Sequence, residues 1–185
     1  MAGNADFCQI PVMPEVIERA RERYAEMGER AEAGEYGWAG FAAELAIIEA
    51  INAGPKNEMT AAEAPTLDYD ITLTQAAYHS RVEVKTRVAT RGWIHPEKYQ
   101  WVVVPTHQGR EPIKPAADLV LFAWYPLTQS HLWVLGSVRG AAEFQRRAVF
   151  YHENDPLPRG GWAGDGGAYA IHVDNLRPLP RGLFA

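Results

Sequence analysis

Four side chains with acid–base or metal-binding chemistry follow one another along the chain: Glu44, Asp70, Glu83 and Lys85. Carboxylates bind hard divalent cations, and an ammonium group beside such a cation can orient a water molecule or stabilise a developing negative charge. Hydrolysis of a phosphodiester requires a metal ion that activates water and offsets that charge. These four side chains can act on one metal ion or substrate only if the helix and strands that carry them bring them close together.

Glu44 lies in the apolar stripe of a predicted helix. The spacing predicts this helix over residues 41–52, and at about 100° per residue Phe41, Glu44 and Ile48 fall within one arc. A buried carboxylate is costly unless it is paired or binds a metal. Two interpretations stay open at this point: an ion pair with a buried arginine or lysine that serves only the fold, or a functional carboxylate.

Asp70, Glu83 and Lys85 lie on two stretches in which polar and apolar residues alternate. Residues 68–74 predict a strand whose polar face carries Asp68 and Asp70. Residues 81–87 predict a second strand with Glu83 and Lys85 on one face, and the short segment between them predicts a hairpin. Each feature alone is weak, because a Glu–Lys pair on one strand is often a salt bridge worth only about 0.2–1 kcal/mol.

A glutamate on a helix, an aspartate on a strand and Glu-x-Lys on the next strand together form a more specific pattern. In this order the sequence resembles the PD-(D/E)xK nuclease superfamily, on Glu44, Asp70 and Glu83-Val84-Lys85. The resemblance covers about residues 38–138. Tyr69 precedes Asp70 where the family pattern has proline. Asp68 therefore remains an alternative for the role of Asp70.

The resemblance implies a restriction-endonuclease-like α/β fold, with a central mixed β-sheet flanked by helices. It implies that Asp70, Glu83 and the backbone carbonyl of Val84 bind Mg²⁺ or Mn²⁺. Lys85 would then position water or stabilise the transition state, and Glu44 would hold a metal-bound water or a second cation. The implied catalytic set is Glu44, Asp70, Glu83 and Lys85.

Basic and aromatic side chains cluster around the second strand and are candidates for contact with nucleic acid. Basic groups bind phosphates, and an aromatic ring can stack on an exposed base. The alternative is that arginines and lysines simply flank a strand and that the tryptophan belongs to the core. The candidates are Arg81, Arg87, Arg91, Trp93 and Lys98.

The rest of the chain predicts one domain over residues 1–185. It divides into an N-terminal helical part (1–37), a nuclease-like core (38–138) and a C-terminal elaboration (139–185). Two nearly apolar stretches suggest central strands covered on both faces. The further expected elements are a helix over 14–33, a loop over 55–66, strands over 101–104, 118–124 and 131–138, a short helix over 139–147 and an edge strand over 168–173.

Composition narrows the function classes. Cys8 is the only cysteine in 185 residues, which excludes an internal disulfide and a multi-cysteine metal site. The net charge is −5, but residues 1–70 carry −9 and residues 71–185 carry +4, so a local basic face remains possible. No apolar run is long enough to span a membrane, and the N-terminus lacks a basic segment followed by an apolar one. We therefore expect a cytoplasmic protein that does not bind membranes.

The predicted function is metal-dependent hydrolysis of DNA by an endonuclease of repair, junction-resolving or phage type. A phage-encoded protein would act in the cytoplasm of its host. A homodimer is one possible assembly, because cutting two strands commonly takes two such sites. The alternative function is a catalytically silent nuclease-like domain that binds nucleic acid or a protein partner.

Overall fold

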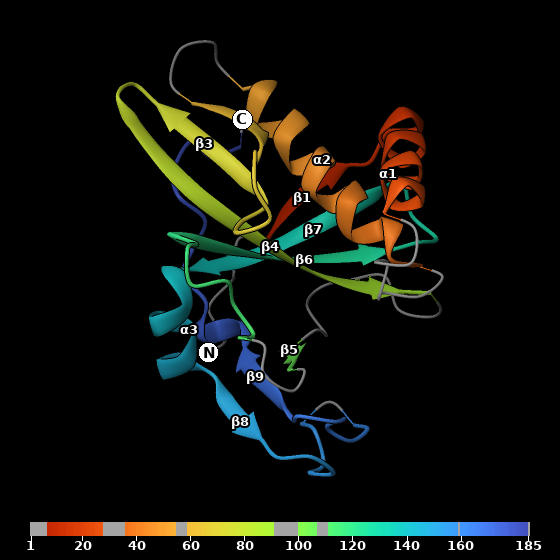
Figure 1. The fold of residues 1–185 in the computed structure, drawn as a ribbon, viewed down its shortest axis with the longest axis vertical. Coiled ribbons are helices and arrows are strands. Elements are labelled where there is room, and N and C mark those ends of the chain that lie inside the picture. The colour runs from red at the N-terminus through yellow and green to blue at the C-terminus, as the bar shows by residue number, and fades with distance from the viewer. Residues whose placement is uncertain are drawn as a thin grey trace.

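Six strands form the main sheet, in the order β1-β7-β6-β4-β3-β2 (Figure 1). Strands β4 and β6 run parallel, whereas every other neighbouring pair runs antiparallel, so the sheet is mixed. The bounds of the strands are Cys8–Pro11 (β1), Thr60–Glu63 (β2), Ile71–Gln75 (β3), Tyr78–Ala89 (β4), Leu119–Pro126 (β6) and His131–Val138 (β7). This computed structural model describes residues 7–27, 36–54, 59–90, 100–106, 111–158 and 160–184.

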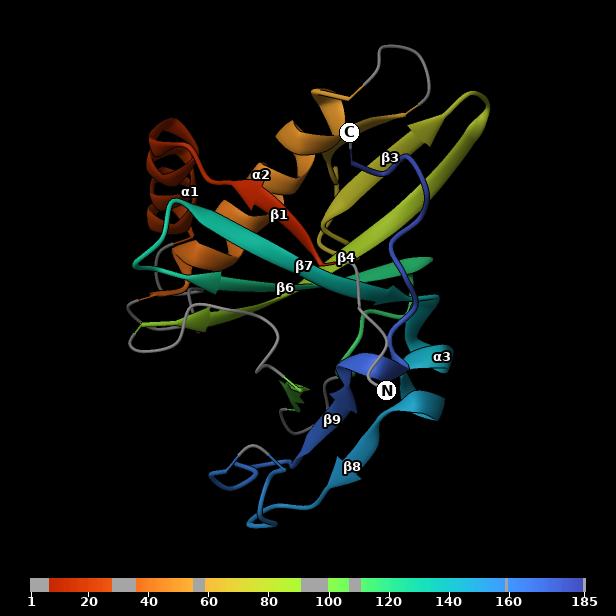
Figure 2. The same cartoon turned by 180° about the vertical axis from the view of Figure 1, so that it is seen from behind.

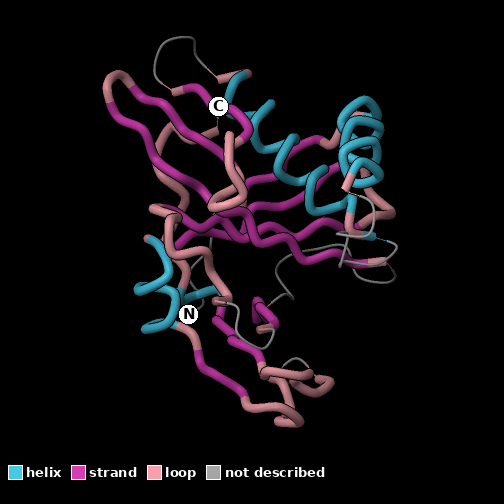
Figure 3. Tube along the Cα trace, in the orientation of Figure 1, coloured by secondary structure: helices cyan, strands magenta, loops and turns pink. Residues whose placement is uncertain are grey.

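A second, smaller sheet has three strands in the order β5-β9-β8 (Figure 3). Helices α1 and α2 cover one face of the main sheet, while the small sheet and α3 lie on the opposite side (Figures 1 and 2). The described residues thus form a single α/β domain with three α-helices. The remaining elements are α1 (Pro14–Glu26), α2 (Trp38–Asn52), β5 (Trp101–Pro105), α3 (Gly140–Arg147), β8 (Val149–Tyr151), β9 (Ala168–His172) and a 3₁₀ helix (Val173–Asn175).

Strand β6 lies between two hydrophobic cores. Its side chains alternate, so Leu121 and Tyr125 enter the core under α2 while Phe122 and Trp124 enter the core shared with α3 and the small sheet. This confirms the prediction that the apolar stretches 118–124 and 131–138 are strands covered on both faces. Within the described residues, no helix is long and apolar enough to cross a membrane.

The face of helix α2 that packs against the sheet combines several alanines with larger aliphatic residues. Ala39, Ala42 and Ala43 are fully buried there. At its C-terminal end, the Asn52 side chain donates to the Ala61 carbonyl and accepts from the Ala61 N–H, both at 2.8 Å. The amide of Asn52 therefore acts like a neighbouring strand and attaches the helix to β2.

Several predicted elements differ from the structure. The strand predicted over residues 68–74 is β3, which begins at Ile71, so Asp68 and Asp70 precede the strand. The stretch 55–66 contains strand β2, because its residues 60–63 pair with β3 despite a weak strand pattern. The stretch 168–173 is not an edge strand, because β9 lies between β5 and β8. The helix predicted over 14–33 is α1, which ends at Glu26; residues 28–35 lie outside the described part.

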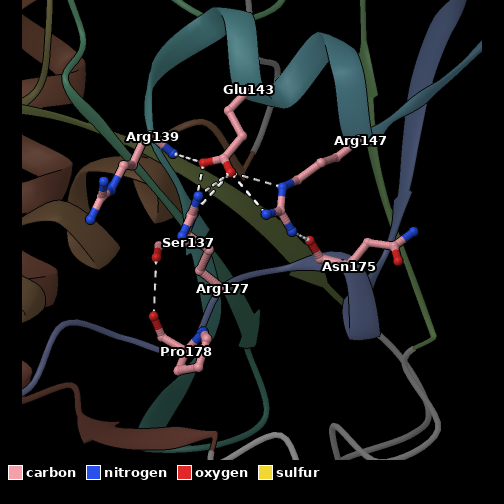
Figure 4. Close-up of polar contacts among 7 residues, drawn as sticks. All are labelled: Ser137, Arg139, Glu143, Arg147, Asn175, Arg177 and Pro178. Atoms are coloured by element: carbon pink, nitrogen blue, oxygen red, sulfur yellow. Dashed lines mark hydrogen bonds and ion pairs between the residues drawn. The ribbon is translucent and has the colours of Figure 1, made fainter.

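A buried carboxylate, Glu143, joins α3 to the C-terminal segment (Figure 4). It is 5% exposed and accepts hydrogen bonds from the Arg139 backbone N–H (2.6 Å), Arg147 Nε (2.9 Å) and Arg177 Nε (2.8 Å). The backbone of Arg177 in turn exchanges two hydrogen bonds with Ser137 of β7. The bond from Arg177, with the backbone bond and both guanidinium charges, lowers the pKa of Glu143 to about 2.

We expect Glu143→Gln to reduce the free energy of unfolding by about 3 kcal/mol at pH 7, since it leaves buried donors without a charged acceptor. The pKa of Glu143 is lower in the folded protein than its ordinary value of 4.5, so the stabilisation is present above pH 4.5 and disappears as the pH falls toward 2. Urea unfolding at pH 7 and pH 3 measures both effects.

The control is Glu153→Gln, which removes the same charge from an exposed position. It should change the free energy of unfolding by less than about 0.5 kcal/mol. Equal losses in the two variants, or a loss in Glu143→Gln that persists undiminished at pH 3, would contradict the structural role of Glu143.

Candidate active site at the divergence of strands β3 and β4

Strand β4 changes partners at its middle. Its first half pairs with β3, up to the pair Ile71–Val82, and its second half pairs with β6 from Val82 onward. Asp70 closes the β3 ladder, because its N–H donates to the Val82 carbonyl at 2.8 Å. Among the described residues, no strand pairs with this edge of β4 beyond Val82. The candidate site lies beyond Val82, where this edge of β4 no longer has β3 as a partner.

The Asp70 side chain occupies this free edge. Its Oδ2 accepts a hydrogen bond from the Val84 N–H at 2.7 Å, and its Oδ1 lies 2.5 Å from Lys114 Nζ. The N–H and C=O of one strand residue point to the same side of the strand. The Val84 carbonyl is therefore directed toward the same edge as the Asp70 carboxylate, in a position where it can add a third oxygen.

Glu83 carries the most deeply buried carboxylate of the group, at 1% exposure. Its Oε2 accepts a hydrogen bond from the Lys114 backbone N–H at 2.7 Å. Its Oε1 lies 2.7 Å from Lys85 Nζ, but this approach lacks hydrogen-bond geometry, and no described group donates a hydrogen bond to that oxygen. The charge of Glu83 is compensated, while one oxygen keeps capacity for a further ligand.

Glu44 faces the same region from α2. Its side chain is 13% exposed, and burial together with the charge of Asp70 raises its pKa to about 8 against the opposing charges of Arg23 and Lys114. Arg23 Nη1 lies 3.7 Å from Glu44 but 2.6 Å from Glu63, so its shorter contact is elsewhere. Glu44 is therefore only weakly paired, and its surroundings favour the protonated form of its carboxyl group.

The structure brings all four predicted catalytic residues into one region. Glu83 and Lys85 contact each other, Asp70 bonds to the residue between them, and the charge of Asp70 acts on Glu44. Asp68, the alternative to Asp70, is exposed, and its N–H bonds to Thr66 Oγ1. The geometry places Asp70 rather than Asp68 beside Val84.

The predicted nucleic-acid contacts are only partly covered by the described residues. Arg81 binds Asp118 through Nε and Nη2, at 3.0 Å and 2.8 Å, in an exposed two-pronged ion pair that also raises the pKa of Arg81. Arg87 is exposed on β4. Arg91, Trp93 and Lys98 lie outside the described residues.

Sequence reasoning missed Lys114, which touches both Asp70 and Glu83. It lies in an irregular segment with proline on either side of Ile113-Lys114 and 31 positions beyond Glu83. No period or short motif connects residues so far apart. Only the parallel pairing of β4 with β6 brings this segment beside Glu83.

The donor set suits a hard divalent cation. Carboxylate and carbonyl oxygens are the ligands that Mg²⁺ and Mn²⁺ prefer, and the Glu83 oxygen without a hydrogen-bond donor is such a ligand. Across the described residues, no three His, Cys, Asp or Glu side chains are grouped to hold a metal. Two carboxylates with a backbone carbonyl do not form such a group, so the donor types fit while the metal itself stays a proposal.

Comparisons with protein-family models, with curated proteins and with solved structures find no match for this chain. The site is therefore defined by its own geometry: an aspartate directly before β3, a glutamate on β4, two lysines against them, and a glutamate with a raised pKa on the covering helix.

We expect Glu44→Gln to stabilise the protein at pH 8. The pKa of Glu44 is raised from 4.5 to about 8, so between these values the folded state holds a proton that the unfolded state has released. The free energy of unfolding of the wild type therefore falls as the pH rises through this window. Glutamine has no such dependence, so the variant should be more stable by of the order of 2 kcal/mol at pH 8.

Chemical denaturation from pH 4.5 to pH 8 tests this expectation. Glu22→Gln, at an exposed position on α1, serves as the control and should follow the pH dependence of the wild type. A Glu44→Gln variant whose advantage does not grow with pH would show that Glu44 is ionised in the folded protein.

Proposed function

We propose that this protein is a metal-dependent nuclease that hydrolyses phosphodiester bonds in DNA. The observation that carries the proposal is the assembly around Val84. Asp70 directly precedes β3, Glu83 lies on β4 in contact with Lys85, and Glu44 faces them from α2. This is the set of residue types that the resemblance to the PD-(D/E)xK nucleases implies, and it supports the related proposal of a restriction-endonuclease-like fold.

Each residue has a separate task in this proposal. Asp70, Glu83 and the Val84 carbonyl would hold Mg²⁺ or Mn²⁺, which when bound supplies a Lewis acid that activates water and offsets charge on the phosphate. Lys85, anchored on β4, orients the attacking water or stabilises the added negative charge. Glu44, near Asp70, would hold a metal-bound water or a second cation.

The substrate and assembly belong to the same proposal. The second part of the chain, residues 71–185, has a net charge of +4, which suits contact with a phosphate backbone through Arg87 and its neighbours. The described residues form a single domain, which favours an endonuclease that reads DNA structure, as in repair, junction resolution or phage DNA processing. Two copies acting together would cut both strands.

A second candidate function is a silent domain that binds DNA without cutting it. The observation in its favour is that both carboxylates already form ion pairs with lysines, Asp70 with Lys114 and Glu83 with Lys85. If these ion pairs persist in the presence of metal ions, the carboxylates serve only the fold. The two candidates differ in one measurable property, which is metal-stimulated cleavage.

We expect the wild type to cut supercoiled plasmid or branched DNA with Mg²⁺ or Mn²⁺ and not with EDTA. Asp70→Asn, Glu83→Gln and Lys85→Ala should each reduce the cleavage rate by about 10²-fold or more, because each removes a metal ligand or a charge beside the reacting phosphate. Gel assays on supercoiled, linear, single-stranded and branched DNA measure the rates and separate endonuclease from exonuclease action.

The matched control is Asp68→Asn, two positions from Asp70 and exposed. It should cut at the rate of the wild type. Equal residual cutting by the wild type and all variants would identify a contaminating nuclease. DNA binding by folded wild type without cleavage of any substrate would favour the silent domain.

A further inference from the structure

We infer that Lys114 is a positioning residue that holds Asp70 and Glu83 in place without metal and releases Asp70 when a divalent cation binds. This inference rests on the proposed nuclease function, because it concerns the same two carboxylates. It assigns a role to a residue that lies outside the Glu-x-Lys pattern, in the segment that precedes β6.

Lys114 contacts both carboxylates through two different groups. Its backbone N–H donates to Glu83 Oε2 at 2.7 Å, and its Nζ lies 2.5 Å from Asp70 Oδ1. One residue therefore fixes the relative position of two side chains that belong to different strands. Lys85, by comparison, has an ion pair only with Glu83 among the described contacts.

The ammonium of Lys114 occupies the oxygen that a metal would need. Asp70 Oδ2 already accepts a hydrogen bond from the Val84 N–H at 2.7 Å, so Oδ1 is the oxygen left to contact a cation. In this structure the ammonium of Lys114 fills that position. Two lysines balance two carboxylates in this arrangement. A divalent ion added beside both ammonium groups would meet like charge at short range, which is unfavourable. One ammonium must therefore withdraw.

Lys114 can withdraw its ammonium while its backbone N–H still holds Glu83, whereas Lys85 contacts Glu83 through its ammonium alone. The Lys114 side chain is 35% exposed, so the flexible stem can turn to solvent. Its backbone stays anchored, because the adjacent Ile113 is fully buried and Asp118 is bound to Arg81. The backbone hydrogen bond to Glu83 can therefore remain after the ammonium leaves Asp70, which keeps one ligand preorganised.

Calorimetric titration of the full chain with Mn²⁺ alone tests the inference. We expect Lys114→Met to bind Mn²⁺ about tenfold more tightly than the wild type, because the competing charge is gone. Lys114→Arg keeps the charge and should bind with the affinity of the wild type. In EDTA the Tm of Lys114→Met should be lower than that of the wild type. Saturating Mn²⁺ should raise the Tm of Lys114→Met by more than it raises the Tm of the wild type.

A measurement on the wild type keeps the test independent of how the variants fold. The chain has four lysines, so the Lys114 side-chain resonance can be assigned in a ¹³C-lysine-labelled sample by comparison with Lys114→Arg. Saturating Mg²⁺ should move this resonance to the position of a solvent-exposed lysine. A Lys114 resonance that does not move would overturn the inference.

The outcomes separate the inference from the proposed function. Mn²⁺ binding that is lost in Asp70→Asn but is equal or weaker in Lys114→Met leaves the metal site intact and overturns the role of Lys114. Mn²⁺ binding that is absent in the wild type and in Lys114→Met overturns the metal site, and the proposed nuclease function with it.

Discussion

The burial of Glu83 is the constraint on which the rest of the site depends. A carboxylate at 1% exposure requires hydrogen bonds and a nearby opposite charge from its surroundings. Lys85 supplies charge from the same strand, and Lys114 supplies a backbone N–H from a distant segment. Because Lys114 also reaches Asp70, the compensation of one buried charge fixes the position of a second carboxylate. The contacts that compensate the buried carboxylate of Glu83 therefore also position the other side chains of the site.

Two glutamates, Glu143 and Glu44, show how different surroundings shift the pKa of the same residue type in opposite directions. Glu143 accepts bonds from two arginines and a backbone N–H, so its pKa falls to about 2 and its charge stabilises the fold. Burial and the charge of Asp70 raise the pKa of Glu44 to about 8, and its one long contact with Arg23 opposes this rise only in part. The charged form of the carboxyl group is thus favoured at Glu143 and disfavoured at Glu44.

The parts of the site that the sequence predicted are those with a short period. Helical spacing placed Glu44 on a partly buried side of α2, and alternation placed Glu83 and Lys85 on one strand, as they are in β4. Asp70 was predicted inside a strand, but it directly precedes β3 and reaches the Val84 N–H from there. The contact of Lys114 with these residues could not be predicted, because it depends on pairing between segments far apart in the sequence. The elements of the fold likewise divide into those predicted from a short period and those that depend on distant pairing.

Strands β4, β6 and β7 were predictable because their apolar residues must be buried whatever their partners are. Strand β2 was not, since residues 60–63 have little strand preference and are held by β3 and by the Asn52 side chain. The central place of β9 was not predictable either, because it requires β5 from residues 101–105 as a partner. The restriction-endonuclease-like fold itself stays a proposal.

The parallel pairing of β4 with β6 explains why a distant lysine reaches Glu83. Parallel neighbours cannot be joined by a tight turn, so the chain must leave the end of β4 at Ala89 and return to the start of β6 at Leu119. This crossover delivers β5 to the small sheet on the way. It must then enter β6 beside the residues that begin the parallel ladder, which are Val82 and Glu83. The register places Asp118 beside Arg81, and a turn closed by the Ala117 N–H on the Lys114 carbonyl brings Lys114 back to Glu83.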